Sequence, residues 1–183
     1  MIFSKHMRNI LEGQISFVEK TLKNKCGLVL LTGQNDSPLT EAFEDFSIFL
    51  SQKKRKVSAL HNNSTWSIED KLIKWPDNVK STFVNPKVGM SYSEEINKFE
   101  PHENSVLMID QIIDTESAKS AFEFASNKSL VISSIRSTEC ASGIMRLLDM
   151  GVSSAKIDQT LLAIIALATP ESNAKKCTIL AYV

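Results

Sequence analysis

Residues 27–43, GLVLLTGQNDSPLTEAF, contain the spacing of a phosphate-binding loop. In such a loop the pattern G-x-x-x-x-G-K-[ST] follows a buried strand and opens a helix. Its glycines let backbone N–H groups approach phosphate, its Lys reaches the outer phosphates, and its final hydroxyl binds magnesium. On this chain Gly33 holds the first position, Thr40 holds the last, and Ser37 lies between them. These three residues are the candidate positions for binding a nucleotide.

Three other residues of the same segment oppose phosphate binding. Pro38 stands at the second glycine position, where it has no N–H to donate and holds φ at about −65°. Leu39 stands at the Lys position and brings no charge. Asp36 adds a carboxylate inside a loop that should hold an anion. We therefore do not expect ordinary ATP binding at this loop.

Strands and helices must alternate along the chain to position this segment. Short runs rich in apolar and β-branched residues predict strands at residues 28–33, 56–60, 81–86, 105–110, 129–134 and 177–183. Helical spacing of apolar residues predicts helices at residues 8–25, 38–52, 67–75, 91–99, 114–126, 138–151 and 153–168. This alternation predicts an α/β fold with a mainly parallel sheet that is flanked by helices on both faces. Ligands of such sheets bind at the carboxyl ends of the strands.

The composition excludes several classes of function. The chain has 183 residues, enough for one domain with a core of its own. Its 21 basic and 21 acidic residues cancel, so the overall charge gives no reason to expect nucleic acid or an anionic membrane. The basic run at residues 53–56 follows a predicted helix, and we interpret it as a solvated helix end. The apolar run at residues 161–168 is far shorter than the roughly 20 residues that span a bilayer.

The three cysteines give no sign of a metal or redox site. Cys26, Cys140 and Cys177 are far apart, and no pair has the spacing of metal ligands or of a redox motif. The N-terminus shows no secretory signal. We therefore expect a reducing, cytoplasmic compartment and no bound metal.

Three stretches together resemble one protein family. They are VNPKVGMSY (residues 84–92), SVLMIDQIIDTESAKSAFEFASNKSLVISS (105–134) and GIMRLLDMGV (143–152), of which RLLDMG is the most specific. In order and spacing they are similar to the hexameric ATPases of type II secretion and type IV pilus assembly, more than to the retraction motors. The resemblance implies a RecA-like P-loop NTPase fold in a single domain over residues 1–183. It also implies that the family's N-terminal domain and Cys-rich insert are absent.

The resemblance locates the family's catalytic segment, G-E-[IM]-R-D, at residues 110–114. Gln111 stands in place of the catalytic Glu, so no carboxylate polarises water there. Ile113 replaces the Arg, whereas Asp114 matches the family. Asp110 closes an apolar strand, as does the magnesium-binding Asp of other P-loop enzymes. The alternative interpretation, which we favour, is an Asp that caps the next turn and holds no metal.

Other positions of the family's site are also changed. Its T-G-H and L-H-T-N segments fall on residues 127–129 and 135–138, and the first now ends in Ser129. Arg136 in the second segment can contact an anion, but a surface ion pair is the simpler interpretation. The family's acidic box follows the second strand, where this chain has no Asp or Glu between residues 56 and 68. His61 lies nearby, and we interpret it as a packing or surface residue.

The retained scaffold and the altered site predict a protein that is not an enzyme. We expect a non-catalytic relative of these ATPases, without ATP, magnesium or another cofactor, that binds proteins in or near a secretion or pilus machine. Its partners would be an intact ATPase of the machine or the inner-membrane platform, and not nucleic acid. The chain would be cytoplasmic, or peripheral at the bacterial inner membrane through its partners, and a monomer or weak dimer in isolation.

Two alternatives remain open from the sequence. One is a weak or divergent Mg-dependent NTPase of the same machinery that uses Asp110, Thr40 and a residue from a partner. The other is a redirected module that binds a small ligand or a protein, with His61, Gln111 and Arg136 lining a changed pocket.

Overall fold

The computed structural model describes residues 3–33, 38–62, 73–127, 129–167 and 177–181 of the chain. Within these residues, the strands form one sheet in the order β3-β2-β4-β5-β1-β6-β7. The strands are β1 (Gly27–Gly33), β2 (Lys56–His61), β3 (Lys80–Phe83), β4 (Ser105–Ile109), β5 (Leu130–Arg136), β6 (Leu161–Leu167) and β7 (Cys177–Ala181). All neighbours pair in parallel except β6 and β7. The predicted α/β fold with a mainly parallel sheet is confirmed.

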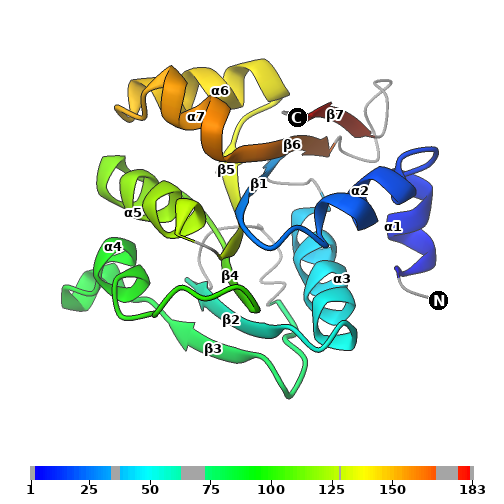
Figure 1. The fold of residues 1–183 in the computed structure, drawn as a ribbon, viewed down its shortest axis with the longest axis horizontal. Helices are drawn as coiled ribbons and strands as arrows, with labels where there is room; N and C mark the ends of the chain where they lie inside the picture. Colours follow the sequence, from blue (N-terminus) through cyan, green and yellow to red (C-terminus); the bar gives the residue numbers. More distant parts are fainter. Residues whose placement is uncertain (1–2, 34–37, 63–72, 128, 168–176, 182–183) are drawn as a thin grey trace.

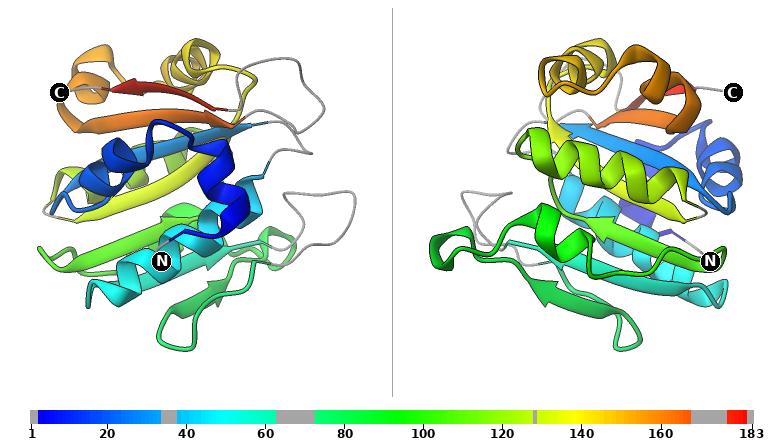
Figure 2. Two further views of the ribbon diagram at one scale, coloured as in Figure 1. Left: turned by 90° about the vertical axis from the view of Figure 1, so that its right-hand side faces the viewer. Right: turned by 60° about the vertical axis from the view of Figure 1, so that its left-hand side comes forward.

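Helices cover both faces of the sheet (Figure 1). One face carries α1 (Lys5–Ile10), α2 (Ile15–Thr21) and α3 (Leu39–Gln52). The other carries α4 (Tyr92–Ile96), α5 (Thr115–Ser126), α6 (Cys140–Asp149) and α7 (Ser154–Thr160). A short 3-10 turn, η1 (Pro86–Val88), follows β3. Figure 2 shows β3 and β7 at opposite edges of the sheet. No helix in the described part of the chain is long and apolar enough to cross a membrane.

The central strand β1 is buried along its whole length. Because side chains alternate between the faces of a strand, Val29 and Leu31 pack in the core beneath α1–α3, whereas Leu28 and Leu30 pack in the core on the other face. This two-sided burial explains why β1 reads as a continuous apolar run. Gly27 opens the strand at φ +114°, and a Cβ there would lie 2.6 Å from a side-chain carbon of Leu162. Only glycine meets both conditions.

Two helices begin where the sequence predicted, because their caps are local. Ser91 caps α4, and its hydroxyl accepts a hydrogen bond from the Glu94 N–H at 3.1 Å. Asp114 caps α5, and its carboxylate accepts from the Ser117 N–H at 2.7 Å. Each cap satisfies an N–H group that the first helical turn leaves without a partner.

The predicted helix over residues 153–168 is wrong in its second half. Helix α7 ends at Thr160, and the apolar run that follows is β6, between β1 and β7. An apolar run of this length suits a buried helix or a buried strand equally well, and pairing with β1 and β7 selects the strand.

The predicted helix over residues 8–25 is also wrong as a single element. Gly13, at φ +76°, lies in the turn between α1 and α2. The helix predicted at residues 67–75 falls mostly outside the described residues, and its described end, residues 73–75, is not helical.

Candidate functional site

The parallel pairing brings several predicted site residues to one edge of the sheet. Gly33 at the end of β1 lies opposite Arg136 at the end of β5. Asp110 directly follows β4, and its N–H donates to the Leu60 carbonyl of β2 at 2.9 Å. Strand β5 lies between β1 and β4. Gly33, Asp110 and Arg136 therefore share the carboxyl edge, where ligands of such sheets bind.

Asp110 is fully buried at this edge and is held by its neighbours. One carboxylate oxygen accepts a hydrogen bond from the Tyr92 phenol. The other accepts from the Asn62 N–H at 2.6 Å. The Ser134 hydroxyl donates to the Asp110 carbonyl. A buried carboxylate needs such donors to offset its lost hydration. The hydrogen bonds also connect the ends of β2, β4 and β5 to the start of α4.

Tyr92 is the donor that the sequence did not single out. It is the first residue of α4, and its side chain is 2% exposed. Burial, and then the charge of Asp110, raise the pKa of Tyr92 above its ordinary value. The phenol is therefore neutral and able to donate its proton to the carboxylate. Tyr92 lies within the family-like stretch at residues 84–92, but nothing in its spacing pointed to Asp110.

The segment with phosphate-loop spacing is described only in part. Gly33 ends β1, and Thr40 lies half-buried in the first turn of α3. Leu39, at the Lys position, is 1% exposed and packs in the core beneath α1–α3. Ser37 and Asp36 lie outside the described residues. Leu39 therefore fixes the start of α3 by packing and does not point toward solvent.

The residues after Asp110 have separate roles. Gln111 is 5% exposed, whereas Ile113 is 41% exposed. Asp114 is used as the cap of α5. The Asp110 carboxylate accepts hydrogen bonds from Tyr92 and Asn62, and the cap of α5 is formed four residues later.

Two other predicted positions lie apart from Asp110. Ser129 precedes β5 at the opposite, amino edge, where its hydroxyl lies 2.6 Å from that of Ser105 and accepts from the His102 N–H at 2.9 Å. His61 ends β2 at the carboxyl edge, and its ring packs against those of Trp75 and Phe83, with centroids 6.1 Å and 5.9 Å away. His61 thus packs as predicted, and Ser129 cannot share a site with Gly33.

The side-chain oxygens at the carboxyl edge fit a magnesium ion whose other ligands are water and phosphate oxygens. Across the described ranges, no group of three or more His, Cys, Asp or Glu side chains could hold a metal. Magnesium, however, is usually held by one or two protein oxygens together with water and phosphate. The Asp110 carboxylate, whose oxygens accept hydrogen bonds from Tyr92 and Asn62, and the Thr40 hydroxyl are the candidate oxygen ligands.

Comparison with known families identifies the fold. The family model described as "Type II/IV secretion system protein" matches residues 7–178. The chain belongs to this family. The solved structure of the Legionella pneumophila ATPase DotB superposes with a TM-score of 0.68 at 14% identity, over 92% of this chain and 48% of that one. The predicted RecA-like P-loop NTPase fold is confirmed.

Curated relatives agree with this family. The type IV pilus assembly ATPase PilB of Thermus thermophilus is 28% identical over 148 residues, which are 81% of this chain and 16% of PilB. The competence protein ComGA of Bacillus subtilis is 28% identical over 145 residues, which are 79% of this chain and 39% of ComGA. The chain thus spans well under half the length of these relatives.

Membership in this family corrects one prediction. We expected from the altered loop that the chain is not an enzyme, and that expectation is wrong, because its relative PilB is a named ATPase. The prediction judged single side chains such as Leu39 in isolation. A changed motif position shows only which side chain is missing at that position. Hydrolysis depends on all the side chains and backbone groups that meet at the carboxyl edge of the sheet.

Proposed function

We propose that this chain serves a protein-secretion or pilus-assembly machine as an ATPase-family subunit that handles magnesium nucleotide in an altered way. The observation that carries the proposal is the family match over residues 7–178 together with the buried carboxylate of Asp110 at the end of β4. The activity and partners of the whole protein belong to this proposal, since the chain spans only part of its relatives.

In this proposal the protein's own groups have distinct tasks. Asp110 and Thr40 would hold magnesium, and the bound ion would neutralise phosphate charge. Leu39 cannot supply the missing cation, because its side chain lies in the core. Arg136, opposite Gly33 in the register of β1 and β5, brings positive charge to the same edge. Tyr92 and the Asn62 N–H fix the orientation of the Asp110 carboxylate.

Phosphate release from Mg-ATP by the purified chain tests this function. We expect slow hydrolysis above background and a loss of about tenfold or more in Asp110→Asn, because the metal-supporting charge is gone. Asp149→Asn removes an exposed carboxylate at the end of α6 and should leave the rate unchanged. Background rates for the chain, both alone and mixed with an intact assembly ATPase, would contradict the proposed nucleotide chemistry.

A second candidate function is protein binding within the same machine. The family match over residues 7–178 favours it, because the curated relatives include a pilus assembly ATPase. The partner would be an intact secretion or pilus ATPase or the inner-membrane platform, and the chain alone would be a monomer or weak dimer. Adding the chain to an assembly ATPase should change the rate of that ATPase. Light scattering that shows a stable hexamer of the chain alone would contradict the oligomeric state.

A further inference from the structure

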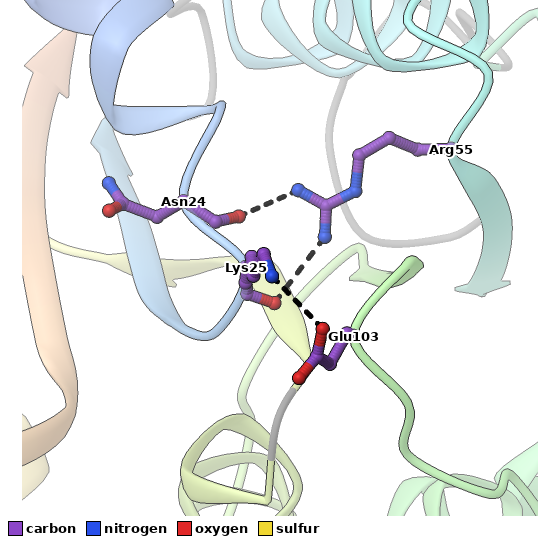
Figure 3. A network of polar contacts seen from close by, with 4 residues as sticks. All are labelled: Asn24, Lys25, Arg55 and Glu103. Carbon is purple, nitrogen blue, oxygen red and sulfur yellow. Dashed lines mark hydrogen bonds and ion pairs between the residues drawn. The ribbon is translucent and has the colours of Figure 1, made fainter.

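The loops at the amino edge of the sheet, opposite the candidate nucleotide site, are joined around Arg55 (Figure 3). The Arg55 guanidinium donates to the Asn24 carbonyl at 2.6 Å and to the Ser105 carbonyl at 3.0 Å. The Lys25 ammonium pairs with the Glu103 carboxylate at 3.0 Å. These contacts hold the loops before β1, β2 and β4 in one surface. The interpretation of residues 53–56 as a solvated helix end is therefore incomplete, since Arg55 is an anchor.

Exposed lysines gather on this surface. Lys23, Lys54 and Lys56 are exposed, and within the described ranges no acidic side chain pairs with them. The C-terminal dipoles of nearby helices favour cations only within the last helical turn. Lys56 is beyond that reach, because it begins β2 and lies four residues after α3 ends at Gln52. The positive charge of Lys56 is therefore not explained by an interaction with the dipole of a helix C-terminus.

A cavity of about 260 Å³ opens beside Lys56. Its lining includes two buried apolar residues of the core on the α4–α7 face, namely Leu107 of β4 and Phe124 of α5. Charged or titratable side chains form its rim, namely Lys56, Lys98, Glu100 and His102. Lys98 is paired with the buried Glu95 carboxylate. The cavity is smaller than most pockets for cofactors, which begin at about 300 Å³, and suits a single apolar side chain.

We infer that this amino edge docks an acidic segment of a partner protein that inserts one apolar side chain into the cavity. The exposed lysines complement acidic residues of the segment, and the part of the cavity lined by Leu107 and Phe124 receives its apolar anchor. A flat anionic membrane surface presents no single apolar side chain to fill a cavity of about 260 Å³. The carboxylates of Glu100 and Glu103 on the same surface oppose the closely spaced phosphates of a nucleic acid.

This inference describes the kind of partner segment that the chain would bind. It rests on the proposed function only in assigning that partner to a secretion or pilus machine. The amino edge lies across the sheet from Asp110, so docking there leaves the candidate nucleotide site open. Binding can therefore be measured without nucleotide.

A fluorescein-labelled peptide, with one leucine flanked by glutamates on both sides, is titrated against the full chain at low ionic strength by fluorescence polarisation. We expect Lys56→Glu to weaken the Kd about tenfold and Glu100→Gln to tighten it about twofold, because each changes the charge on the rim. Lys87→Glu reverses an exposed lysine of η1 and should bind like the wild type. A peptide with serine in place of the leucine should bind more weakly.

Circular dichroism and thermal midpoints first establish that each variant is folded. Equal affinities of Lys56→Glu and Lys87→Glu, or equal binding of the leucine and serine peptides, would overturn the inference. So would tighter binding, at the same ionic strength, to vesicles of phosphatidylcholine and phosphatidylglycerol in equal parts or to a single-stranded oligonucleotide. Peptide binding without ATP hydrolysis would support the inference and contradict the proposed nucleotide chemistry. ATP hydrolysis without peptide binding would support the nucleotide chemistry and contradict the inference.

Discussion

The phenol of Tyr92 donates a hydrogen bond to the carboxylate of Asp110, and both side chains are buried. The contact joins the first turn of α4 to the carboxyl end of β4. The Asn62 N–H binds the other oxygen, so Asp110 is the meeting point of three segments that are distant in sequence. A buried charge in such a position is costly to leave without its donors.

Tyr92→Phe should lower the free energy of unfolding by about 2 kcal/mol, because it removes a hydrogen bond to a buried charge and leaves that charge short of one donor. Denaturant unfolding of both proteins measures the difference. Ser93→Ala is the matched control, because it removes a half-buried hydroxyl of the same helix that lies 2.8 Å from the Ser120 hydroxyl. Its cost should be clearly smaller. Equal costs for the two variants would argue against a special role for the contact between Tyr92 and Asp110.

The same phenol should make stability fall at high pH. Burial and the nearby Asp110 raise the pKa of Tyr92 above its ordinary value of 10.0. Above about pH 10 the unfolded chain loses this proton while the folded chain keeps it, so the free energy of unfolding decreases as pH rises. Below that pH the contribution is fully present. The stability gap between wild type and Tyr92→Phe should therefore shrink between about pH 9 and pH 11. A constant gap would show that the phenol does not titrate differently on folding.

Gly143→Ala should destabilise the fold by about 1–3 kcal/mol, because the added Cβ overpacks the contact between α6 and the sheet. That Cβ would lie 2.8 Å from the Ile164 Cδ1 and 3.0 Å from the Thr32 Cγ2. Ala141→Ser, at an exposed position of the same helix, should change the thermal midpoint little. A midpoint for Gly143→Ala at or above that of the wild type would mean that α6 can shift away from β6 without cost.

Arg55→Lys should destabilise the chain by about 1–2 kcal/mol although it keeps the charge. A lysine cannot reproduce the planar fork that binds the carbonyls of Asn24 and Ser105. Lys25→Met breaks the neighbouring pair with Glu103, whose side chains are 74% and 61% exposed, and should cost less than about 1 kcal/mol. Thermal unfolding of both variants gives the comparison. A larger loss in Lys25→Met than in Arg55→Lys would show that the surface pair, and not the guanidinium, holds the loops.

Local patterns accounted for most elements of the fold. Strands β1 and β4 were predicted because buried parallel strands require continuous apolar runs. The helices at residues 91–99 and 114–126 were predicted from the helical spacing of their apolar residues. The same reasoning misassigned residues 161–167, where β6 lies between β1 and β7. Seven apolar residues satisfy a buried helix and a buried strand alike, and the choice depends on partners far away in the sequence.

The candidate site also has some features that the sequence predicted and others that it did not. The sequence by itself predicted Gly33 and Asp110 at the ends of strands, and it predicted that ligands bind at the carboxyl ends of such strands. It also determined which side chains stand at the motif positions. Only the tertiary structure decided that Tyr92 and Asn62 hold Asp110, that Leu39 packs into the core, and that Ser129 lies at the opposite edge. Spacing along the chain fixes which end of a strand a residue occupies, whereas a contact between side chains depends on how separate elements pack in three dimensions.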